Sequence, residues 1–222
     1  MPFSAHDLRL DYFRIYDIRD CPATERVLTR GQFDRRGQQG VLQGLDLFAA
    51  CTSKNKEPLF DPYSNLTWYR LSQSVPEPTR TVVVRNQFGE ATLWIGKVEA
   101  LLCPAQMLGD GSKPSGKLDH FKVYRVLDYG TPPGVVVDLR DQFAADRVTV
   151  DSPVFFAVPV MKEVRGKRYP VNNPKTHLVI YRTRPKLIAR RVAAADQFAR
   201  RWPIQMLRSV ALAAPSLKVR WK

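Results

Sequence analysis

The chain has 222 residues, 44% of them hydrophobic, so it is long enough to bury a core without the help of a metal ion or a disulfide. No apolar run approaches the ~18 residues of a membrane-spanning helix, and the first residues lack the basic and apolar regions of a signal peptide. These features exclude a helical membrane protein and predict a cytoplasmic protein, unless the chain is the processed form of an exported one, while the net charge of +14 predicts an acidic or polyanionic partner.

A Gln-Phe dipeptide recurs four times at a constant interval of 55 residues. The copies are Gln32-Phe33, Gln87-Phe88, Gln142-Phe143 and Gln197-Phe198. Before each copy an apolar segment ends in a tyrosine, and these four residues are Tyr16, Tyr69, Tyr124 and Tyr181. A register held over this distance indicates internal repeats, which we place at residues 1–60, 61–116, 117–174 and 175–222 and expect to form one or two compact bodies.

In chain order, each repeat opens with an expected strand, at residues 12–16, 65–69, 120–124 and 177–181. Further short segments rich in Val, Phe and Thr predict about three strands per repeat, most clearly at residues 82–84, 92–95, 135–137, 148–150 and 155–160. A three-stranded unit is marginally stable alone, so neighbouring repeats must share cores. We predict a mainly β protein whose repeats close as two paired modules or as one pseudosymmetric barrel-like or propeller-like body.

The fourth repeat departs from this pattern in structure and in charge. Residues 193–199 and 206–214 are rich in Ala, Leu, Arg and Gln, which predicts some helix there. Residues 1–161 contain 19 basic and 19 acidic residues, whereas residues 162–222 contain 16 basic residues and only Glu163 and Asp196 as acids. This segregation predicts a docking surface, and a solvated basic face that keeps the protein soluble is the alternative.

The predicted partner-binding residues are those of the basic last quarter together with one tryptophan. They are Arg165, Lys167, Arg168, Arg184, Lys186, Arg190, Arg191, Arg200, Arg201 and Trp202. Aromatic residues interleaved with this charge, including Tyr169, Trp202 and Trp221, would suit either single-stranded nucleic acid or a protein interface.

The repeated aromatic residues are interpreted as core. Phe33, Phe88, Phe143 and Phe198, with Tyr16, Tyr69, Tyr124 and Tyr181, are expected to fill equivalent places, and each glutamine is expected to bond to backbone near a strand end. A ligand site made once per repeat is the alternative.

Catalytic and metal-binding patterns are weak in this sequence. His120 and His177 begin equivalent strands and could meet to bind a metal, but no further ligands complete a set. Nucleophile and phosphate-loop motifs are absent, and Asp138, Asp141 and Asp146 are expected to cap turns or face solvent. We therefore predict no enzyme activity, no cofactor and no metal. Cys21, Cys51 and Cys103 are expected to act mainly as small buried apolar residues.

Residues 120–124, 141–143 and 155–159 resemble an uncharacterised repeat of predicted secreted myxobacterial and actinobacterial proteins, with the motifs His-x-Lys-Cys-Tyr, Asp-Gln-Phe-Gly and Leu-Cys-x-Pro. In this chain Ile15, Trp68, Val123 and Ile180 stand at the first cysteine, and Cys51 and Cys103 lie near the second. The resemblance implies a shared fold without disulfides and no particular activity.

The sequence thus favours a non-catalytic structural or adaptor subunit whose partners are other protein subunits with an acidic surface. A binding module for an anionic polymer, either nucleic acid or envelope glycan, is the alternative. An enzyme that works at a cleft between repeats is a third hypothesis, and it would require a polar cluster that the repeat pattern does not display.

Overall fold

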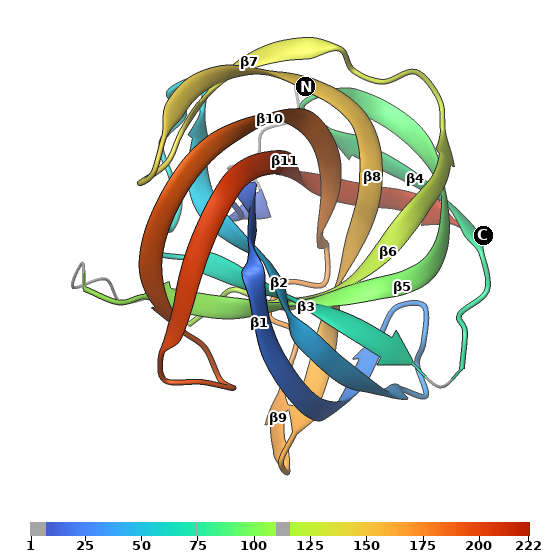
Figure 1. The fold of residues 1–222 in the computed structure, drawn as a ribbon. Coiled ribbons are helices and arrows are strands. Elements are labelled where there is room, and N and C mark those ends of the chain that lie inside the picture. The colour runs from blue at the N-terminus through green and yellow to red at the C-terminus, as the bar shows by residue number, and fades with distance from the viewer. Residues whose placement is uncertain (1–7, 74, 110–115) are drawn as a thin grey trace.

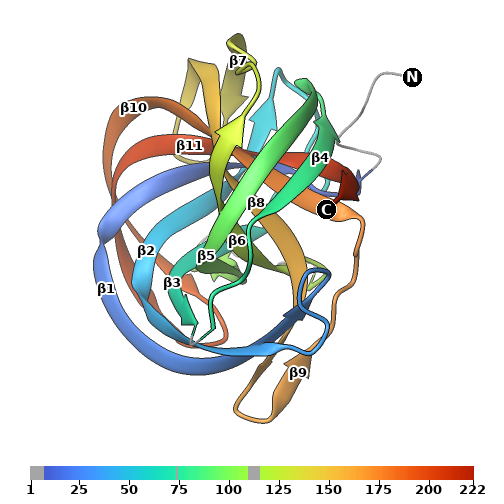
Figure 2. The same ribbon diagram turned by 90° about the vertical axis from the view of Figure 1, so that its right-hand side faces the viewer.

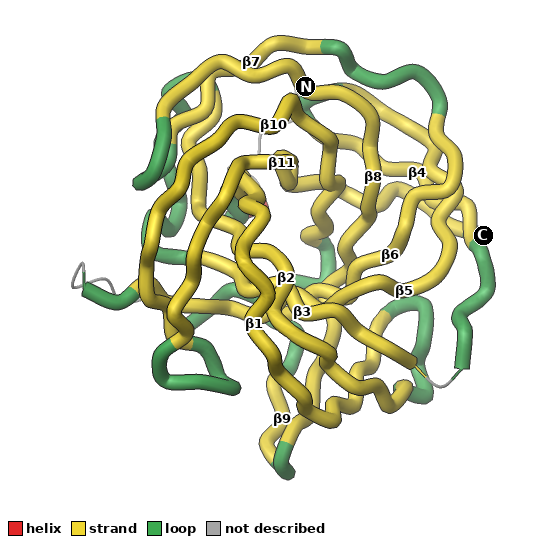
Figure 3. The backbone as a smooth tube through the Cα atoms, viewed as in Figure 1, coloured by secondary structure: helices red, strands yellow, loops and turns green. Residues whose placement is uncertain are grey.

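The computed structural model describes residues 8–73, 75–109 and 116–222. These residues form eleven β-strands and no α-helix (Figures 1 and 3). The strands are β1 (Tyr12–Gly31), β2 (Gln38–Lys54), β3 (Asn65–Gln73), β4 (Arg80–Asn86), β5 (Gly89–Met107), β6 (His120–Tyr129), β7 (Val135–Arg140), β8 (Ala145–Val164), β9 (Lys167–Tyr169), β10 (Thr176–Ala195) and β11 (Trp202–Trp221).

Eight strands form a closed ring in which each strand is antiparallel to its neighbours. The ring follows chain order, β1-β2-β3-β5-β6-β8-β10-β11, and closes where Phe13 of β1 lies opposite Ala213 of β11. Figure 1 shows these strands curving around a common centre. Each repeat contributes two consecutive ring strands, so every neighbouring pair of repeats shares a strand interface.

Each repeat also extends a hairpin arm beyond the ring, and the Gln-Phe dipeptide forms the tip of the arm. In the third repeat, for example, the amide of Asp141 donates to the carbonyl oxygen of Ala144 at 3.0 Å across the two-residue turn. The arms of the first and fourth repeats continue strands β1 and β10. In the second and third repeats the first ring strand ends, and separate strands β4 and β7 build the arm after a proline-containing connection.

The tip of each arm reaches the repeat two positions away in the chain. The arm of β1 pairs with the end of β8, β4 with the end of β11, β7 with the end of β2, and β10 with the end of β5. The first and third repeats therefore exchange arms, as do the second and fourth. Figure 2 shows the resulting body from the side, with the β9 hairpin projecting at one end.

The prediction of a mainly β fold is confirmed, whereas the predicted helix in the fourth repeat is wrong. Residues 193–199 form the end of β10 and a turn, and residues 206–214 lie inside β11. There β11 is paired on both sides, with β10 and with β1. Pairing with two neighbours outweighs the intrinsic helix preference of Ala and Leu.

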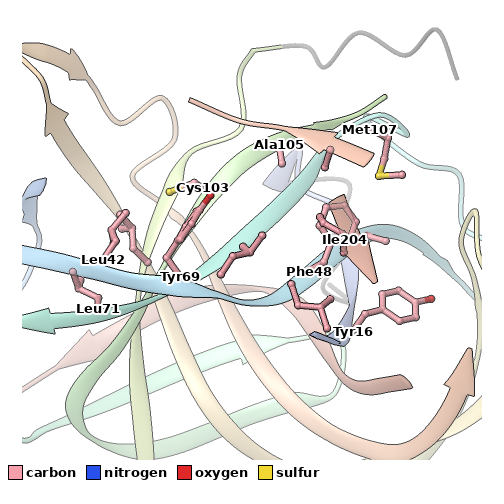
Figure 4. Packing of buried hydrophobic residues seen from close by; sticks show 14 of the residues in the cluster. Tyr16, Leu42, Phe48, Tyr69, Leu71, Cys103, Ala105, Met107 and Ile204 are labelled. Carbon is pink, nitrogen blue, oxygen red and sulfur yellow. The ribbon is translucent and has the colours of Figure 1, made fainter. Parts of the chain in front are cut away.

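The ring is filled by one apolar cluster to which all eight ring strands contribute. Large side chains from the first ring strand of each repeat meet small ones from the second; they include Phe13, Ile15, Trp68, Phe121, Val123, Leu178 and Ile180, with Ala49, Ala100, Ala157, Ala211 and Ala213. Two further clusters lie outside the ring, beneath the arms, and Figure 4 shows part of one of them. Cys51 and Cys103 are buried in these cores, and Cys21 is half-buried.

Candidate interaction surface

Each Gln-Phe turn is fixed by the tyrosine of the repeat two positions away. The phenylalanine and tyrosine rings meet edge to face with centroids 5.2–5.5 Å apart, in the pairs Phe143–Tyr16, Phe198–Tyr69, Phe33–Tyr124 and Phe88–Tyr181. We call each of these pairs a clasp. Phe33 and the four tyrosines are buried, and the other three phenylalanines are half-buried. The four clasps join the arm of each repeat to the ring of its exchange partner.

In three of the four clasps the residue before the glutamine, Asn86, Asp141 or Asp196, supplies the polar part. Asp141 Oδ2 accepts a hydrogen bond from the hydroxyl of Tyr16 at 2.6 Å, and its Oδ1 accepts the amide of Phe143 at 2.7 Å. Asp196 binds Tyr69 and the amide of Phe198 in the same way. Burial and the nearby carboxylate raise the pKa of Tyr16 well above its usual value, so its hydroxyl remains a donor. Figure 4 shows Tyr16 and Tyr69 among the apolar residues that surround them.

The clasp of Phe33 and Tyr124 uses a different acid, because the residue before its glutamine is Gly31. The hydroxyl of Tyr124 instead donates to Oε2 of Glu77 at 3.0 Å. The other oxygen of Glu77 accepts from the fully buried Lys122 at 2.9 Å. Glu77 lies in the connection between β3 and β4, so the second repeat completes a clasp between the first and third.

Arg14 is a buried charge that sequence reasoning missed. Its guanidinium lies 3.2 Å from Asp141 and 2.7 Å from Asp146, and its side chain is 2% exposed. Asp138, by contrast, is exposed and pairs with Arg147. Arg14 stands two residues before Tyr16, as Lys122 does before Tyr124. Side chains two residues apart on a strand share a face, so a charged residue two positions before a core tyrosine is expected to face the core as well. This position was the sequence signal for a buried charge.

The four glutamines hold neighbouring repeats together. Gln87, Gln142 and Gln197 each reach the start of the first ring strand of the preceding repeat, and Gln32 reaches Pro174, two residues before β10. The contacts are Gln87 with the hydroxyl of Tyr12 at 2.5 Å, Gln142 with Asn65 at 3.5 Å, Gln197 with His120 at 3.2 Å, and Gln32 with the carbonyl oxygen of Pro174 at 2.6 Å. All four bond to side chains, because Gln32 also accepts a hydrogen bond from Lys218, and Gln32 makes in addition the backbone bond that we expected.

The two matched histidines have separate surroundings. His120 contacts Gln197 and the ring of Tyr169, while His177 stacks on Phe156 with centroids 5.4 Å apart. Burial lowers the pKa of each histidine to about 3, so both are neutral at pH 7. Among the residues that the structure describes, no group of three His, Cys, Asp or Glu could hold a metal ion.

A cavity of about 410 Å³ lies where the second, third and fourth repeats meet. Its polar wall includes Asn65, His120, Asp196 and Gln197. These side chains already form hydrogen bonds between repeats. Asp196 of the fourth repeat accepts from the second repeat, from Thr67 at 2.8 Å and from Tyr69, and Gln197 bonds to His120 of the third. The cavity thus follows from the way in which clasps and glutamines join the repeats.

The predicted basic residues divide into paired and unpaired groups. Arg165 pairs with Glu25, Arg168 with Glu163, and Lys186 with Asp146, and Lys167 lies over the ring of Tyr169. The other five are exposed and form no ion pair within the described ranges; they are Arg184, Arg190, Arg191, Arg200 and Arg201. All five belong to the arm of the fourth repeat, on β10 or just after its Gln-Phe turn.

The outer edge of β10 is open along this arm. β10 pairs with β8 as far as Thr183 and with β5 from Ala194 onwards, and between these points only β11 pairs with it in the part of the chain that the structure describes. Pro185 lies in the open stretch, and Ala189 has a φ of 50° at a break in the register. A proline and a bulge are features that discourage the addition of another strand. The edge therefore presents side chains, including Leu187, which is 82% exposed.

The aromatic residues near the basic arm are engaged within the molecule. The indole N–H of Trp202 donates to Asp196 at 3.2 Å, and Trp221 packs on Phe33 with centroids 5.0 Å apart. The ring of Tyr169 lies beneath Lys162 and Lys167 at 4.5 and 5.0 Å. These rings consequently stabilise clasps and turns, and the basic side chains are the more accessible part of the surface.

The fold and contacts define a β-repeat protein in which four units close a ring and exchange arms. The model of the family described as a repeat of unknown function, DUF7450, matches residues 65–214. The chain therefore belongs to this family, in agreement with the expectation of an uncharacterised repeat family. No curated protein and no solved structure matches it. Within the described residues, no helix is long and apolar enough to cross a membrane.

Proposed function

We propose that this protein is a non-catalytic adaptor that docks onto an acidic surface of another protein subunit through the arm of its fourth repeat. The observation that carries the proposal is the group of five exposed arginines on that arm without an ion-pair partner in the described residues. Some exposed arginines elsewhere, such as Arg85 and Arg147, pair with neighbouring acids at 2.7–2.8 Å, whereas Arg35 and Arg36 on the arm of the first repeat form no ion pair within the described residues and serve below as the comparison. An unneutralised cluster on one arm is suited to an external acidic partner.

An acidic protein surface fits this arm better than nucleic acid. Single-stranded nucleic acid binds through exposed aromatic rings on which bases stack, combined with a basic groove. Here Trp202 and Trp221 already pack on Tyr69 and Phe33. The arm therefore offers cations, while its own tryptophan, Trp202, is already in contact with Tyr69 and Asp196. An anionic polymer remains the alternative occupant of the same surface.

The test compares two arginine pairs at the same place in different repeats. Arg200 and Arg201 are the second and third residues after Phe198, and Arg35 and Arg36 are the second and third after Phe33; all four are exposed. Tagged wild-type protein, R200E/R201E and R35E/R36E are used to purify the native complex after treatment with nuclease. Both variants change the charge equally, so the second controls for charge alone.

We expect a protein subunit to accompany the wild type and R35E/R36E and to be lost with R200E/R201E. Equal recovery of partners with both variants would overturn the docking surface. Binding to single-stranded DNA or heparin is measured in parallel against salt concentration. A steep loss of affinity with salt that also depends on Arg200 and Arg201 would favour the polymer alternative.

We also propose that Val123 and Ala157 stand where the cysteine-bearing repeats carry a pair of cysteines. His-x-Lys-Cys-Tyr placed on residues 120–124 puts a cysteine at Val123, and Leu-Cys-x-Pro placed on residues 156–159 puts one at Ala157. The register supports this because Val123 of β6 lies opposite Ala157 of β8. Both side chains belong to the cluster inside the ring.

A further inference from the structure

A groove opens beside the basic arm where β1 and β11 separate. Backbone pairing between these strands ends at Ile18 and Met206, and beyond this point Cys21 of β1 still contacts the carbonyl oxygen of Pro203 of β11 through its side chain. The space between them has a volume of about 490 Å³. Its walls come from three strands and include Arg19 and Cys21 of β1, Arg191 and Val192 of β10, and Trp202 and Ile204 of β11.

The chemistry of the groove is an apolar floor between two cations. Val192 and Ile204 lie opposite each other on β10 and β11, and Trp202 lies opposite Ala194 further along the same pair of strands. Arg191 lines the groove from β10 and Arg19 lines it from β1, and both are exposed. No carboxylate is among the described lining residues. A ligand that combines an apolar side chain with flanking negative charges would satisfy both parts of the site.

We infer that this groove receives an acidic segment of the partner protein, with one apolar side chain inserted between Arg19 and Arg191. The inference rests on the proposed function and adds to it the form of the partner: a segment with an anchor residue, bound through its side chains. Addition of a strand to the arm is disfavoured, because Pro22 on β1 and Pro185 on β10 each lack a backbone N–H donor.

Because Cys21 lines the groove, a thiol reagent that modifies it would occupy the groove. Cys21 lines the groove and is half-exposed, with its Sγ 3.6 Å from the carbonyl oxygen of Pro203 on the opposite wall. Cys51 and Cys103 are buried, and burial raises the pKa of the Cys103 thiol to about 12. Because the thiolate is the reactive form, N-ethylmaleimide should modify Cys21 first. The adduct fills the groove without changing the charge of any arginine.

The experiment uses three fluorescent nine-residue peptides and the full chain. The first has four glutamates on either side of a central tryptophan, the second has alanine in place of the tryptophan, and the third has glutamines in place of the glutamates. Dissociation constants are measured by fluorescence anisotropy for the wild type, the Cys21 adduct, R19E/R191E and R35E/R36E. Mass spectrometry verifies a single adduct, and thermal unfolding verifies that each protein is folded. If the adduct does not form or unfolds the chain, Cys21→Trp replaces it.

We expect the acidic tryptophan peptide to bind at least tenfold more tightly than either other peptide. In the Cys21 adduct the tryptophan peptide should bind no more tightly than the alanine peptide. R19E/R191E should bind both acidic peptides more weakly than the wild type does. R35E/R36E should bind both with the affinity of the wild type. Equal affinity of the tryptophan and alanine peptides, or no effect of the adduct, would overturn the groove while leaving the proposed function intact. Equal affinity of the neutral and acidic tryptophan peptides would overturn the role of the two arginines. Absence of binding by any acidic peptide would overturn the inference and count against the proposed function as well.

Discussion

Tyr16 and Asp141 lie 125 positions apart in the chain, yet the tyrosine hydroxyl donates to the aspartate at 2.6 Å. The same relationship joins Tyr69 to Asp196, and in the pair of Tyr181 and Asn86 the amide donates to the tyrosine oxygen at 2.9 Å. The repeats are thus held together by contacts between units two apart, in addition to the strands shared by neighbours. Because each arm is fixed by a unit that is not its neighbour, the removal of one repeat would open the ring and also free the arm of its exchange partner.

The phenylalanine of a clasp should contribute measurably to the free energy of unfolding. Phe143 is half-buried and packs on Tyr16 at 5.5 Å, so Phe143→Ala should lower stability by about 2–3 kcal/mol, somewhat less than a fully buried ring. Phe60→Ala is the control, because Phe60 is exposed, and we expect a loss below about 1 kcal/mol. Urea unfolding measures both. Similar losses in the two variants would mean that the clasp adds no stability.

Gly31 explains why one clasp lacks its own acid. A Cβ atom at position 31 would lie 2.8 Å from Cγ1 of Val160, so a side chain there cannot fit unless Val160 moves. We predict that Gly31→Asp destabilises the protein by roughly 1–3 kcal/mol through overpacking, although aspartate is the natural residue in two other clasps. Val160→Ala should be less damaging in the Gly31→Asp background than in the wild type. A double-mutant cycle by urea unfolding tests this coupling, and additive losses would contradict it.

The constant spacing of Gln-Phe was enough to identify equivalent residues, because repeats preserve local pattern. It could not reveal that Phe143 packs on Tyr16, since the same tyrosine pattern occurs in all four repeats and offers four candidate partners. The alanines of β11 were misread for a physical reason. Ala211 and Ala213 are small because they face the crowded interior of the ring. Alanine is also the residue with the highest helix propensity, so the sequence alone indicated a helix. The groove beside β11 depends on where strand pairing ends, and no residue pattern marks that point.

Acid should destabilise this protein through its buried histidines. Burial and the positive charge of Lys162 lower the pKa of His120 from 6.5 to about 3. Between these values the unfolded chain binds more protons than the folded one, so stability is full above pH 6.5 and falls as the pH decreases towards 3. Each histidine can contribute at most about 1.4 kcal/mol per pH unit. Urea unfolding from pH 7 to pH 4 should show a smaller slope in His120→Asn, which carries the residue found at position 65 of the second repeat. An unchanged slope would show that His120 is protonated in the folded state.

The register of the ring can be tested by a designed disulfide between Val123 and Ala157. Directly paired residues of antiparallel strands have Cα atoms about 4.5–5.5 Å apart, within the range that a disulfide spans. In a Cys51→Ala background, which removes a thiol of the same cluster, Val123→Cys/Ala157→Cys should oxidise readily. It should raise the free energy of unfolding by up to about 4 kcal/mol over its reduced form. The control is Val123→Cys/Val158→Cys, because Val158 lies opposite Lys122 and belongs to the cluster outside the ring. Efficient oxidation of the control, or none in the designed pair, would place β6 and β8 in a different register.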